Sequence, residues 1–416
     1  MKLLALPNAH ALAHVSRLLE IAKVLRARGH EIVFAGHGKY LPVAGWDGFE
    51  TRELAYMPVE QVVRAVRSGK LWEIYRENQL EQFIRAELAL YEAEKPDLLL
   101  LDNRPSARAS AEKAGLACAA VVNVHLTPYR RLPFFSPGNT LGEHFPGVAL
   151  ADRLENASEN FFYDRLVMGG LARLRKRLGL PRRYGYENEE GDISLLADIP
   201  EFSPVRELPA HARYVGPLTW HNTLPAPACL DRLDPAKPTV YLSLGSEGLE
   251  DLLGHLGTLA AEGVQIVVAL GAAGADPGMA VPPGVFLERY VNTDALLPHC
   301  TLVCCHGGNG TLYQALAYGL PCVVVATHQE QYYGGKRIRA LGLGEALTLK
   351  QVKAKGLDVV VAALRRVLGD PGYRDRAQGF AAHFARWRGG EAGADAVEAL
   401  ARDRSITNPG APEKSQ

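Results

Sequence analysis

Apolar residues recur along the chain in two alternating patterns, which predict strands and helices in turn. Between the first two apolar runs, residues 15–25 are apolar at helical spacing, and Gly29 closes that helix. The runs that predict strands in the first half are 2–7, 31–35, 96–102 and 119–124. Strands that alternate with helices indicate a parallel sheet covered on both faces.

The second half repeats this organisation after a segment rich in proline. The first half is also expected to contain longer helices at 68–93 and 151–178 and an irregular surface loop at 128–147. The second half is expected to end in a final helix at about 372–404. The runs that predict strands in the second half are 239–244, 264–270, 302–305 and 322–326. Both halves therefore have the pattern of a doubly wound α/β domain.

The chain is long enough for two domains, and a boundary is expected near residues 214–217. The expected division is an N-terminal domain over 1–216, a linker over 217–238, a C-terminal domain over 239–385, a last helix over 386–404 and a disordered tail over 405–416. One arrangement of the last helix is a return to the N-terminal domain. Open parallel sheets bind ligands beyond the carboxyl ends of their strands, so we expect the two domains to face each other across a cleft.

Charge and composition exclude several classes of protein. Lysine plus arginine equals aspartate plus glutamate at 46 each, whereas a nucleic-acid-binding chain normally has a basic excess. No stretch of about 18 apolar residues predicts a transmembrane segment, and the apolar start is too short for a signal peptide. The six cysteines are irregularly spaced and have no metal-binding pattern, which favours a cytoplasmic protein with a reduced core.

The basic run 173–183 has leucines at helical spacing. It is interpreted as a solvated helix face, with a membrane-surface contact as the alternative.

A glycine-rich turn follows the strand 302–305 and is the most specific local signal. It reads His306-Gly-Gly-Asn-Gly-Thr311, and a helix is expected to start near Thr311. Glycines let the backbone approach a phosphate closely, and a helix N-terminus presents N–H groups with partial positive charge. The alternative is a tight strand–helix turn with Thr311 as the helix cap.

The segment 290–344 resembles the donor-binding signature of the UDP-glycosyltransferase superfamily, the family 1 glycosyltransferases with the GT-B fold. The resemblance implies that Tyr290 stacks on the base and Gln314 holds the ribose, whereas Glu330 and Gln331 hold the donor sugar. The diphosphate contacts that it implies are Ser246, His306, Gly308, Asn309, Gly310 and Thr311. Such an ordered series over about 55 residues is more specific than one glycine motif.

The sequence departs from the signature at the nucleotide site. Gln314 replaces the usual acid, Asn292 stands where proline is common, and Thr293 where glutamine is common. The loss of the acid weakens charge-assisted recognition of the ribose and leaves the identity of the nucleotide open.

Two histidines in the first strand–helix loop are candidates for the base that deprotonates the acceptor. His14 stands directly before the predicted helix, whose positive end favours a neutral imidazole. In the family the catalytic histidine lies sixteen residues before a histidine that corresponds to His30, which implies His14 and leaves His10 as the second choice. The family also has an aspartate at the strand end held here by Asp102, which would orient the base; the alternative is a turn aspartate.

Arg17 replaces a proline that is frequent in the family, and it is expected to reshape the entrance for the acceptor. The aromatic residues Tyr129, Phe134, Phe135 and Phe145 either line an apolar acceptor pocket or serve as packing anchors.

The resemblance therefore implies an inverting glycosyltransferase that needs no metal and no cofactor, the nucleotide sugar being a substrate. The expected partners are that donor, with UDP-glucose as the family's commonest, and a small apolar or aromatic acceptor, as in natural-product glycosylation. The sequence contains no suitably placed acidic DxD motif for a metal. The alternatives are a nucleotide-sugar epimerase, a noncatalytic nucleotide-sugar-binding protein and a transferase for a lipid acceptor at the membrane surface. Monomer and homodimer remain equally open.

Overall fold

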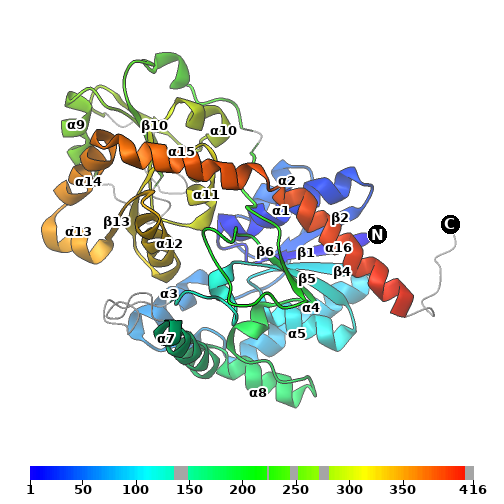
Figure 1. Cartoon of the computed structure of the whole chain (residues 1–416). Coiled ribbons are helices and arrows are strands. Elements are labelled where there is room, and N and C mark those ends of the chain that lie inside the picture. Colours follow the sequence, from blue (N-terminus) through cyan, green and yellow to red (C-terminus); the bar gives the residue numbers. More distant parts are fainter. Residues whose placement is uncertain (135–148, 223, 244–251, 271–280, 408–416) are drawn as a thin grey trace. The chain divides into compact units, whose positions relative to one another are not determined.

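The computed structural model describes residues 1–134, 149–222, 224–243, 252–270 and 281–407 (Figure 1). The chain divides into two compact units. Unit 1 comprises Met1–Trp220 and the chain from Trp387 onward, and unit 2 comprises His221–Arg386. The segment expected to be a linker is split between them, because Leu218 packs in the core of unit 1 whereas Cys229 is buried in unit 2.

The described strands of unit 1 form one parallel sheet in the order β3-β2-β1-β4-β5-β6-β7. The strands are β1 (Lys2–Pro7), β2 (Glu31–Gly36), β3 (Glu50–Glu53), β4 (Leu98–Asp102), β5 (Ala117–Val122), β6 (Ile193–Leu196) and β7 (Ala212–Tyr214). The main helices are α1 (Leu12–Ala27), α2 (Pro42–Trp46), α3 (Val59–Ser68), α4 (Glu77–Glu94), α5 (Pro105–Ala114), α7 (Ala149–Phe162), α8 (Gly169–Arg177) and α16 (Gly389–Thr407). All five residues of β4 are buried, as expected for a central strand with helices on both faces.

The described strands of unit 2 form a second parallel sheet in the order β10-β9-β8-β11-β12-β13. The strands are β8 (Thr239–Ser243), β9 (Gln265–Ala269), β10 (Val285–Glu288), β11 (Leu302–Cys305), β12 (Cys322–Ala326) and β13 (Gly344–Thr348). The helices are α9 (Leu252–Ala261), α10 (Thr293–Leu296), α11 (Asn309–Ala317), α12 (Gln329–Ala340), α13 (Leu349–Lys355), α14 (Asp358–Gly369) and α15 (Pro371–Ala385). The predicted pair of doubly wound α/β domains is confirmed.

The single C-terminal helix expected at about 372–404 is two helices. α15 contacts α11 in unit 2, whereas α16 contacts α1 in unit 1 and extends to Thr407 (Figure 1). Gly389 and Gly390 allow the close approach of α16, because a Cβ at these positions would lie 2.2 Å from the Pro217 oxygen and 2.7 Å from the Glu20 oxygen. The expected tail is therefore helical as far as Thr407, and residues 408–416 lie outside the described part.

Two other long helices predicted from apolar spacing are interrupted. The predicted helix 68–93 begins only at Glu77, since Gly69 ends α3 with φ of +69° and a short 3-10 turn, η1 (Leu71–Glu73), follows. The predicted helix 151–178 contains a π-helical turn, η3 (Tyr163–Val167), before α8. Gly170 is needed at this break because a Cβ there would lie 2.0 Å from the Tyr75 oxygen.

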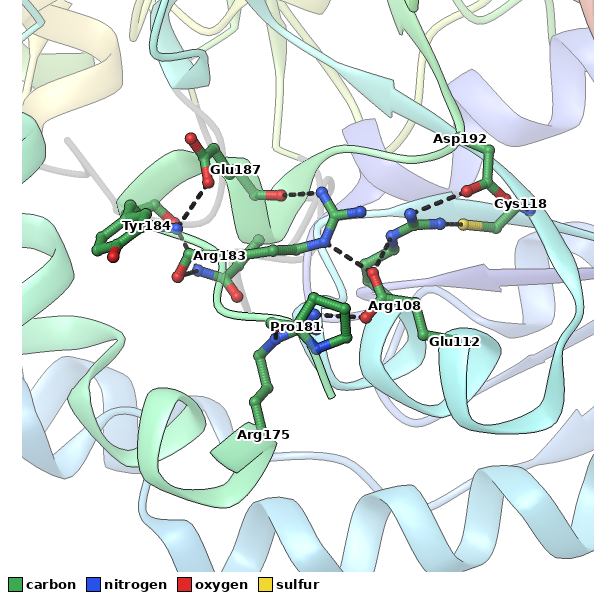
Figure 2. A network of polar contacts seen from close by, with 11 residues as sticks. Arg108, Glu112, Cys118, Arg175, Pro181, Arg183, Tyr184, Glu187 and Asp192 are labelled. Atoms are coloured by element: carbon green, nitrogen blue, oxygen red, sulfur yellow. Dashed lines mark hydrogen bonds and ion pairs between the residues drawn. The ribbon is translucent and has the colours of Figure 1, made fainter. Parts of the chain in front are cut away.

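The basic run 173–183 is not a solvated face throughout. Arg175 is 1 % exposed, and it forms an ion pair with Glu112 and donates from Nε to the Pro181 oxygen at 2.9 Å (Figure 2). Arg183 donates to the same Glu112 carboxylate at 2.7 Å (Figure 2). The run therefore ties α8 to α5 through a shared acid, and this pairing argues against the membrane contact considered from the sequence.

All six cysteines are buried and reduced, in agreement with the expected apolar core. Among the loop aromatics, Phe134 is 7 % exposed and stacks on His125 with 4.8 Å between ring centroids. Phe134 is thus a packing anchor rather than part of an open pocket. Phe135 and Phe145 lie outside the described residues.

Candidate active site

One candidate site lies where two neighbouring strands of unit 1 end. β1 pairs with β4, with Pro7 opposite Asp102. The Asn8 N–H donates to the Asp102 carbonyl oxygen at 2.9 Å, and the Asn8 side-chain amide donates to Asn103 Oδ1 at 2.9 Å. Asn103 has φ of +52°, a conformation that asparagine tolerates better than most residues. The loop after β1 is therefore held against Asp102.

His14 and Asp102 form a direct side-chain pair. Their Nδ1 and Oδ1 atoms lie 2.7 Å apart, the Asp102 side chain is fully buried, and the His14 side chain is 16 % exposed. Two acceptors at that distance would repel, so Nδ1 carries the proton and donates to the carboxylate. The lone pair of the neutral ring then lies on Nε2, where a base needs it. Because α1 already begins at Leu12, His14 lies in its first turn and not before it.

Arg17 completes this pair. Its Nε and Nη2 atoms donate to the two oxygens of Asp102 at 2.9 and 2.6 Å, and the residue is 8 % exposed. Arg17 Nη2 also lies 3.0 Å from His14 Nδ1, since both groups converge on Asp102 Oδ1. Arg17 is thus a buried bidentate partner of the aspartate, a contact that the sequence did not predict.

The polar network continues across the ends of the next two strands. Arg17 donates from Nη1 to Oδ1 of Asn123, which follows β5. The Asn123 amide lies 3.3 Å from Oδ2 of Asp198, which follows β6 and also accepts from the Val124 N–H at 2.6 Å. Sequence reasoning missed Asn123 and Asp198, and the only available signal was the recurrence of polar residues at successive strand ends.

His10 does not contact Asp102 in this arrangement. Its Nε2 lies 2.6 Å from the Met57 oxygen, and burial lowers its pKa. A ring nitrogen held by a backbone carbonyl is consistent with a structural histidine. Of the two histidine candidates, only His14 is brought to the aspartate.

A second buried acid lies in the electrostatic environment of Asp102. Burial raises the pKa of Glu189 to about 7, with a smaller upward contribution from the Asp102 charge. The Tyr163 hydroxyl donates to Glu189 at 3.2 Å, which opposes this rise in pKa. Glu189 therefore carries a proton over much of the acidic pH range. The negative charge of Asp102 is offset by Arg17, which contacts both of its carboxylate oxygens.

A second candidate site is the turn between β11 and α11 in unit 2. α11 begins at Asn309 with Gly308 as its N-cap, two residues earlier than predicted, so Thr311 is not the cap. Gly307 has φ of +96°, and a Cβ there would lie 2.6 Å from Val324 Cγ1. The turn can therefore be formed only with glycine at this position.

The two sides of this turn differ in packing. On one side α12 lies so close that a Cβ at Gly334 would be 2.4 Å from the Gly307 oxygen. On the other side, a Cβ built on Gly310 meets no atom of the described residues within 4 Å, apart from its chain neighbours and the backbone of α11 itself. The first N–H groups of a helix have no partner within it, so the first turn of α11 carries donors of the kind that bind anions.

The unusual residues of the nucleotide signature contact each other. Gln314 Nε2 donates to Thr293 Oγ1 at 3.0 Å, and Asn292 caps α10 by accepting from the Ala295 N–H at 3.2 Å. Two positions at which the sequence departs from the family signature, Gln314 and Thr293, are therefore hydrogen-bonded to each other. This coupling was not visible in the sequence because the two positions are 21 residues apart.

The remaining predicted donor residues have varied positions. Tyr290 follows β10 and is 38 % exposed, and His306 directly follows β11. Gln331 is 4 % exposed, and its Oε1 accepts from both the backbone and the hydroxyl of Thr327 at 2.8 and 2.9 Å. Gln331 therefore holds the start of α12, next to the half-buried Glu330. Ser246 lies outside the described residues.

Comparison with known proteins identifies the family. Residues 250–387 match the erythromycin biosynthesis protein CIII-like C-terminal domain. An inactive PGL/p-HBAD biosynthesis glycosyltransferase of Mycobacterium bovis is 30 % identical over 256 residues, which cover 61 % of this chain and 69 % of the relative. The chain belongs to the family 1 glycosyltransferases. It is thus a glycosyltransferase, as the sequence predicted, and the epimerase alternative is not supported.

Two other family 1 glycosyltransferases match over nearly the whole chain. A PGL/p-HBAD biosynthesis glycosyltransferase of Mycobacterium tuberculosis is 28 % identical, covering 92 % of this chain and 88 % of the relative. A PGL/p-HBAD biosynthesis rhamnosyltransferase of Mycobacterium bovis is 29 % identical, covering 94 % and 85 %.

Solved structures confirm the GT-B fold of this family 1 glycosyltransferase. CalG4, the calicheamicin glycosyltransferase, matches with a TM-score of 0.70 and 20 % identity over 97 % of this chain and 99 % of that one. The spinosyn rhamnosyltransferase SpnG, in complex with spinosyn aglycone, matches with a TM-score of 0.69 and 20 % identity, covering 96 % and 100 %. VinC, in complex with dTDP, matches with a TM-score of 0.66 and 20 % identity, covering 97 % and 100 %.

Proposed function

We propose that this glycosyltransferase moves a sugar from a nucleoside diphosphate to a hydroxyl group of a small apolar acceptor, with inversion and without a metal. The observation that carries the proposal is the 2.7 Å contact between His14 Nδ1 and Asp102 Oδ1. This contact fixes the tautomer in which Nε2 is the base.

In the proposed step, Nε2 of His14 removes the proton of the acceptor hydroxyl while the hydroxyl oxygen bonds to the anomeric carbon. The bond from that carbon to the diphosphate oxygen breaks, and its electron pair leaves with the diphosphate. Asp102 stabilises the imidazolium that forms. A single displacement of this kind inverts the anomeric centre.

The leaving diphosphate is proposed to bind at the first turn of α11. The N–H groups of Gly310 and Thr311 belong to the end of the helix that favours anions. Electrostatic stabilisation by preorganised donors takes the place of a metal ion in this proposal. His306 and Asn309 flank the same turn and remain candidate contacts.

Arg17 is proposed to act as a positioning residue. It holds both oxygens of Asp102, and so it fixes the direction in which the carboxylate accepts from His14. Its positive charge also offsets the Asp102 charge, which limits how strongly the aspartate stabilises the imidazolium.

For the donor, we propose a thymidine diphosphate sugar in preference to UDP-glucose. The ribose of UDP has two neighbouring hydroxyls that suit a carboxylate, whereas the deoxyribose of dTDP has only one of them. Gln314 is uncharged and donates from Nε2 to Thr293 at 3.0 Å, so it lacks the carboxylate that suits two neighbouring hydroxyls. The dTDP complex of VinC and the rhamnosyltransferase name of one relative support this choice.

For the acceptor, an apolar or aromatic molecule of the natural-product type is proposed. The support comes from SpnG, whose structure contains its spinosyn aglycone, and from the match to a family described by erythromycin biosynthesis. A lipid with a hydroxyl head group belongs to the same chemical class, and the names of the mycobacterial relatives link them to PGL/p-HBAD biosynthesis.

The test is an incubation of the full chain with dTDP- and UDP-sugars and a panel of phenolic and aliphatic alcohols. We expect nucleoside diphosphate release only when an acceptor is present, a product of opposite anomeric configuration by NMR, and no loss of turnover with EDTA. Donor epimerisation without an acceptor, or retention of configuration, would contradict the proposal.

The donor preference is tested separately by calorimetric titration of dTDP and UDP. Gln314→Glu is expected to shift the preference toward UDP by about fivefold, as for one hydrogen bond of about 1 kcal/mol. An equal change in affinity for both nucleotides would show that Gln314 does not read the ribose, and would leave the role of His14 untouched.

A further inference from the structure

One helix of unit 1 has the opposite amphipathicity from that of a helix facing water. The exposed positions between 150 and 166 follow helical spacing along α7 and η3. They are Leu150, Arg153, Leu154, Ala157, Ser158, Phe161, Phe162, Arg165 and Leu166, which together we call the outer face. Its leucines and phenylalanines are large and well exposed, with Leu150 at 63 % and Phe161 at 59 %.

The inner side of the same helix carries the polar residues. Glu159 forms an ion pair with Arg130 at 2.6 Å, and the Asn156 amide donates to the Arg131 oxygen at 3.0 Å. Asp164 accepts from the Gly185 N–H at 2.8 Å. These buried contacts fix the rotation of the helix about its axis, so the apolar residues are held outward.

The charges of the outer face have one sign. Its two charged residues are Arg153 and Arg165, one near each end. The four acids between 150 and 166, all within the described part of the chain, are buried or half-buried. An apolar surface with basic residues and no exposed acid matches a surface of opposite charge that also accepts hydrocarbon.

A further exposed aromatic residue lies in an element that contacts η3. η1 contacts η3, and Trp72 of η1 is 56 % exposed. Tryptophan is enriched where protein meets the boundary between lipid head groups and hydrocarbon. Ser158 is the single polar uncharged residue of the outer face, whereas a typical protein–protein interface carries several direct hydrogen bonds.

We propose that the outer face of α7 and η3, with Trp72, docks this enzyme onto an anionic lipid surface. Phe161, Phe162 and the leucines enter the head-group region while Arg153 and Arg165 bind lipid phosphates. None of the described helices is long and apolar enough to cross a membrane, and the proposed contact lies in the plane of the surface. The docking concerns where the enzyme works and does not depend on the proposed donor or base.

The experiment is co-sedimentation of the full chain with vesicles of phosphatidylcholine alone or mixed equally with phosphatidylglycerol. We expect binding to the mixed vesicles and weak binding to the neutral ones. Phe161→Gln/Phe162→Gln is expected to lower vesicle affinity by about 100-fold or more. Arg153→Glu/Arg165→Glu is expected to remove the preference for anionic vesicles, a loss of about 30-fold or more.

Two matched variants control for general effects of exposed residues. Trp46→Gln changes an aromatic residue that is 54 % exposed on α2, and Arg85→Glu reverses an exposed charge on α4. Both are expected to bind vesicles as the unchanged chain does. All outer-face variants are expected to keep their thermal stability and their turnover of a water-soluble acceptor.

Three outcomes would overturn the proposal. The first is that the unchanged chain does not bind anionic vesicles, and the second is that the control variants lose binding as strongly as the outer-face variants. The third is a dimer in solution that Phe161→Gln/Phe162→Gln converts to monomer without affecting vesicle binding, which would assign the outer face to a second copy of the chain.

Discussion

The candidate site in unit 1 and the candidate site in unit 2 are built from different chemical groups. In unit 1, the site consists of charged side chains that are buried and already paired: His14 with Asp102, and Asp102 with Arg17. In unit 2, the turn at 306–311 consists of backbone and glycine, with a packed side at Gly307 and an open side at Gly310. The first depends on side chains that are distant in sequence, and the second depends on the backbone of one short segment.

This difference fits the two tasks that we propose. A base must be held in one tautomer before the acceptor arrives, and only side chains can do this. A diphosphate brings its own charge, so backbone N–H groups and the partial charge of a helix end are enough to bind it. We therefore expect substitutions in unit 1 to change proton transfer and those in unit 2 to change donor binding.

The largest effect is expected for His14→Ala. Loss of the base should lower kcat by about 10²- to 10⁴-fold, the usual contribution of general base catalysis, while the affinity for dTDP stays the same. Steady-state kinetics and calorimetric titration measure the two quantities on the same preparation. The matched variant His10→Ala, which removes the histidine held by Met57, should keep kcat within a few-fold. If His14→Ala retained normal turnover with an intact fold, unit 1 would not contain the base.

The next largest effect is expected for Arg17, where two variants separate charge from geometry. Arg17→Gln removes the positive charge 3.0 Å from the His14 ring, so Asp102 stabilises the imidazolium more strongly. The acidic limb of the pH profile of kcat/KM should then move to higher pH, and kcat should fall by about 10- to 100-fold because the carboxylate is no longer held.

Arg17→Lys retains the charge but cannot donate in a bidentate way, so it should lower kcat and leave the position of the acidic limb unchanged. His10 and Glu189, the other titratable groups of this region, are the same in both variants. An unshifted profile in Arg17→Gln would reduce Arg17 to a structural role.

Much of this fold could be predicted from the sequence, because central parallel strands are continuous apolar runs. β1, β11 and β12 have the predicted bounds, and their buried residues explain why. The helices at 68–93 and 151–178 were predicted too long, since their breaks depend on tertiary contacts. Gly170, for example, is needed only because the Tyr75 oxygen lies against it.

The two candidate sites also differed in how well the sequence revealed them. The turn in unit 2 is local, so its glycines appear as a motif in consecutive residues. The network in unit 1 joins Arg17 to Asp102 and Asn123 across 85 and 106 residues, and no spacing rule shows such contacts. His14 and Asp102 were predicted through family resemblance, whereas the contacts of Arg17 with Asp102 and Asn123 were not predicted.

The buried Glu189 should make the stability of unit 1 depend on pH, because its charged form is unfavourable in the folded chain. Its pKa is about 7 in the folded chain, whereas an ordinary glutamate has 4.5. Between these pH values the unfolded chain releases the proton and the folded chain keeps it, so stability falls as pH rises from about 4.5 to 7. Glu189→Gln should remove this loss, which amounts to about 3 kcal/mol above pH 7.

The measurement for Glu189 is the midpoint of urea unfolding at pH 5 and pH 8. The variant and the unchanged chain should differ at pH 8 and approach each other at pH 5. Glu262→Gln in unit 2 is the matched control, because the pKa of this exposed glutamate is lowered by its hydrogen bond with Arg365. A difference of the same size at both pH values would mean that Glu189 is already charged in the folded chain at pH 5.

The smallest effect, and the most direct test of the turn, comes from placing a methyl group on either side of it. Gly310→Ala puts a Cβ into open space within α11, so it should stabilise the fold by about 0.5 to 1 kcal/mol, as alanine does in helices. If a diphosphate occupies that space, the same methyl group should weaken dTDP binding by about tenfold.

Gly307→Ala is the counterpart on the packed side, where positive φ and contact with Val324 should lower the melting temperature. A gain in stability combined with a loss of donor affinity cannot arise from a damaged fold, and thermal melts with and without dTDP measure both. If Gly310→Ala bound dTDP as tightly as the unchanged chain, the open side of the turn would not be the place where the donor's phosphates lie.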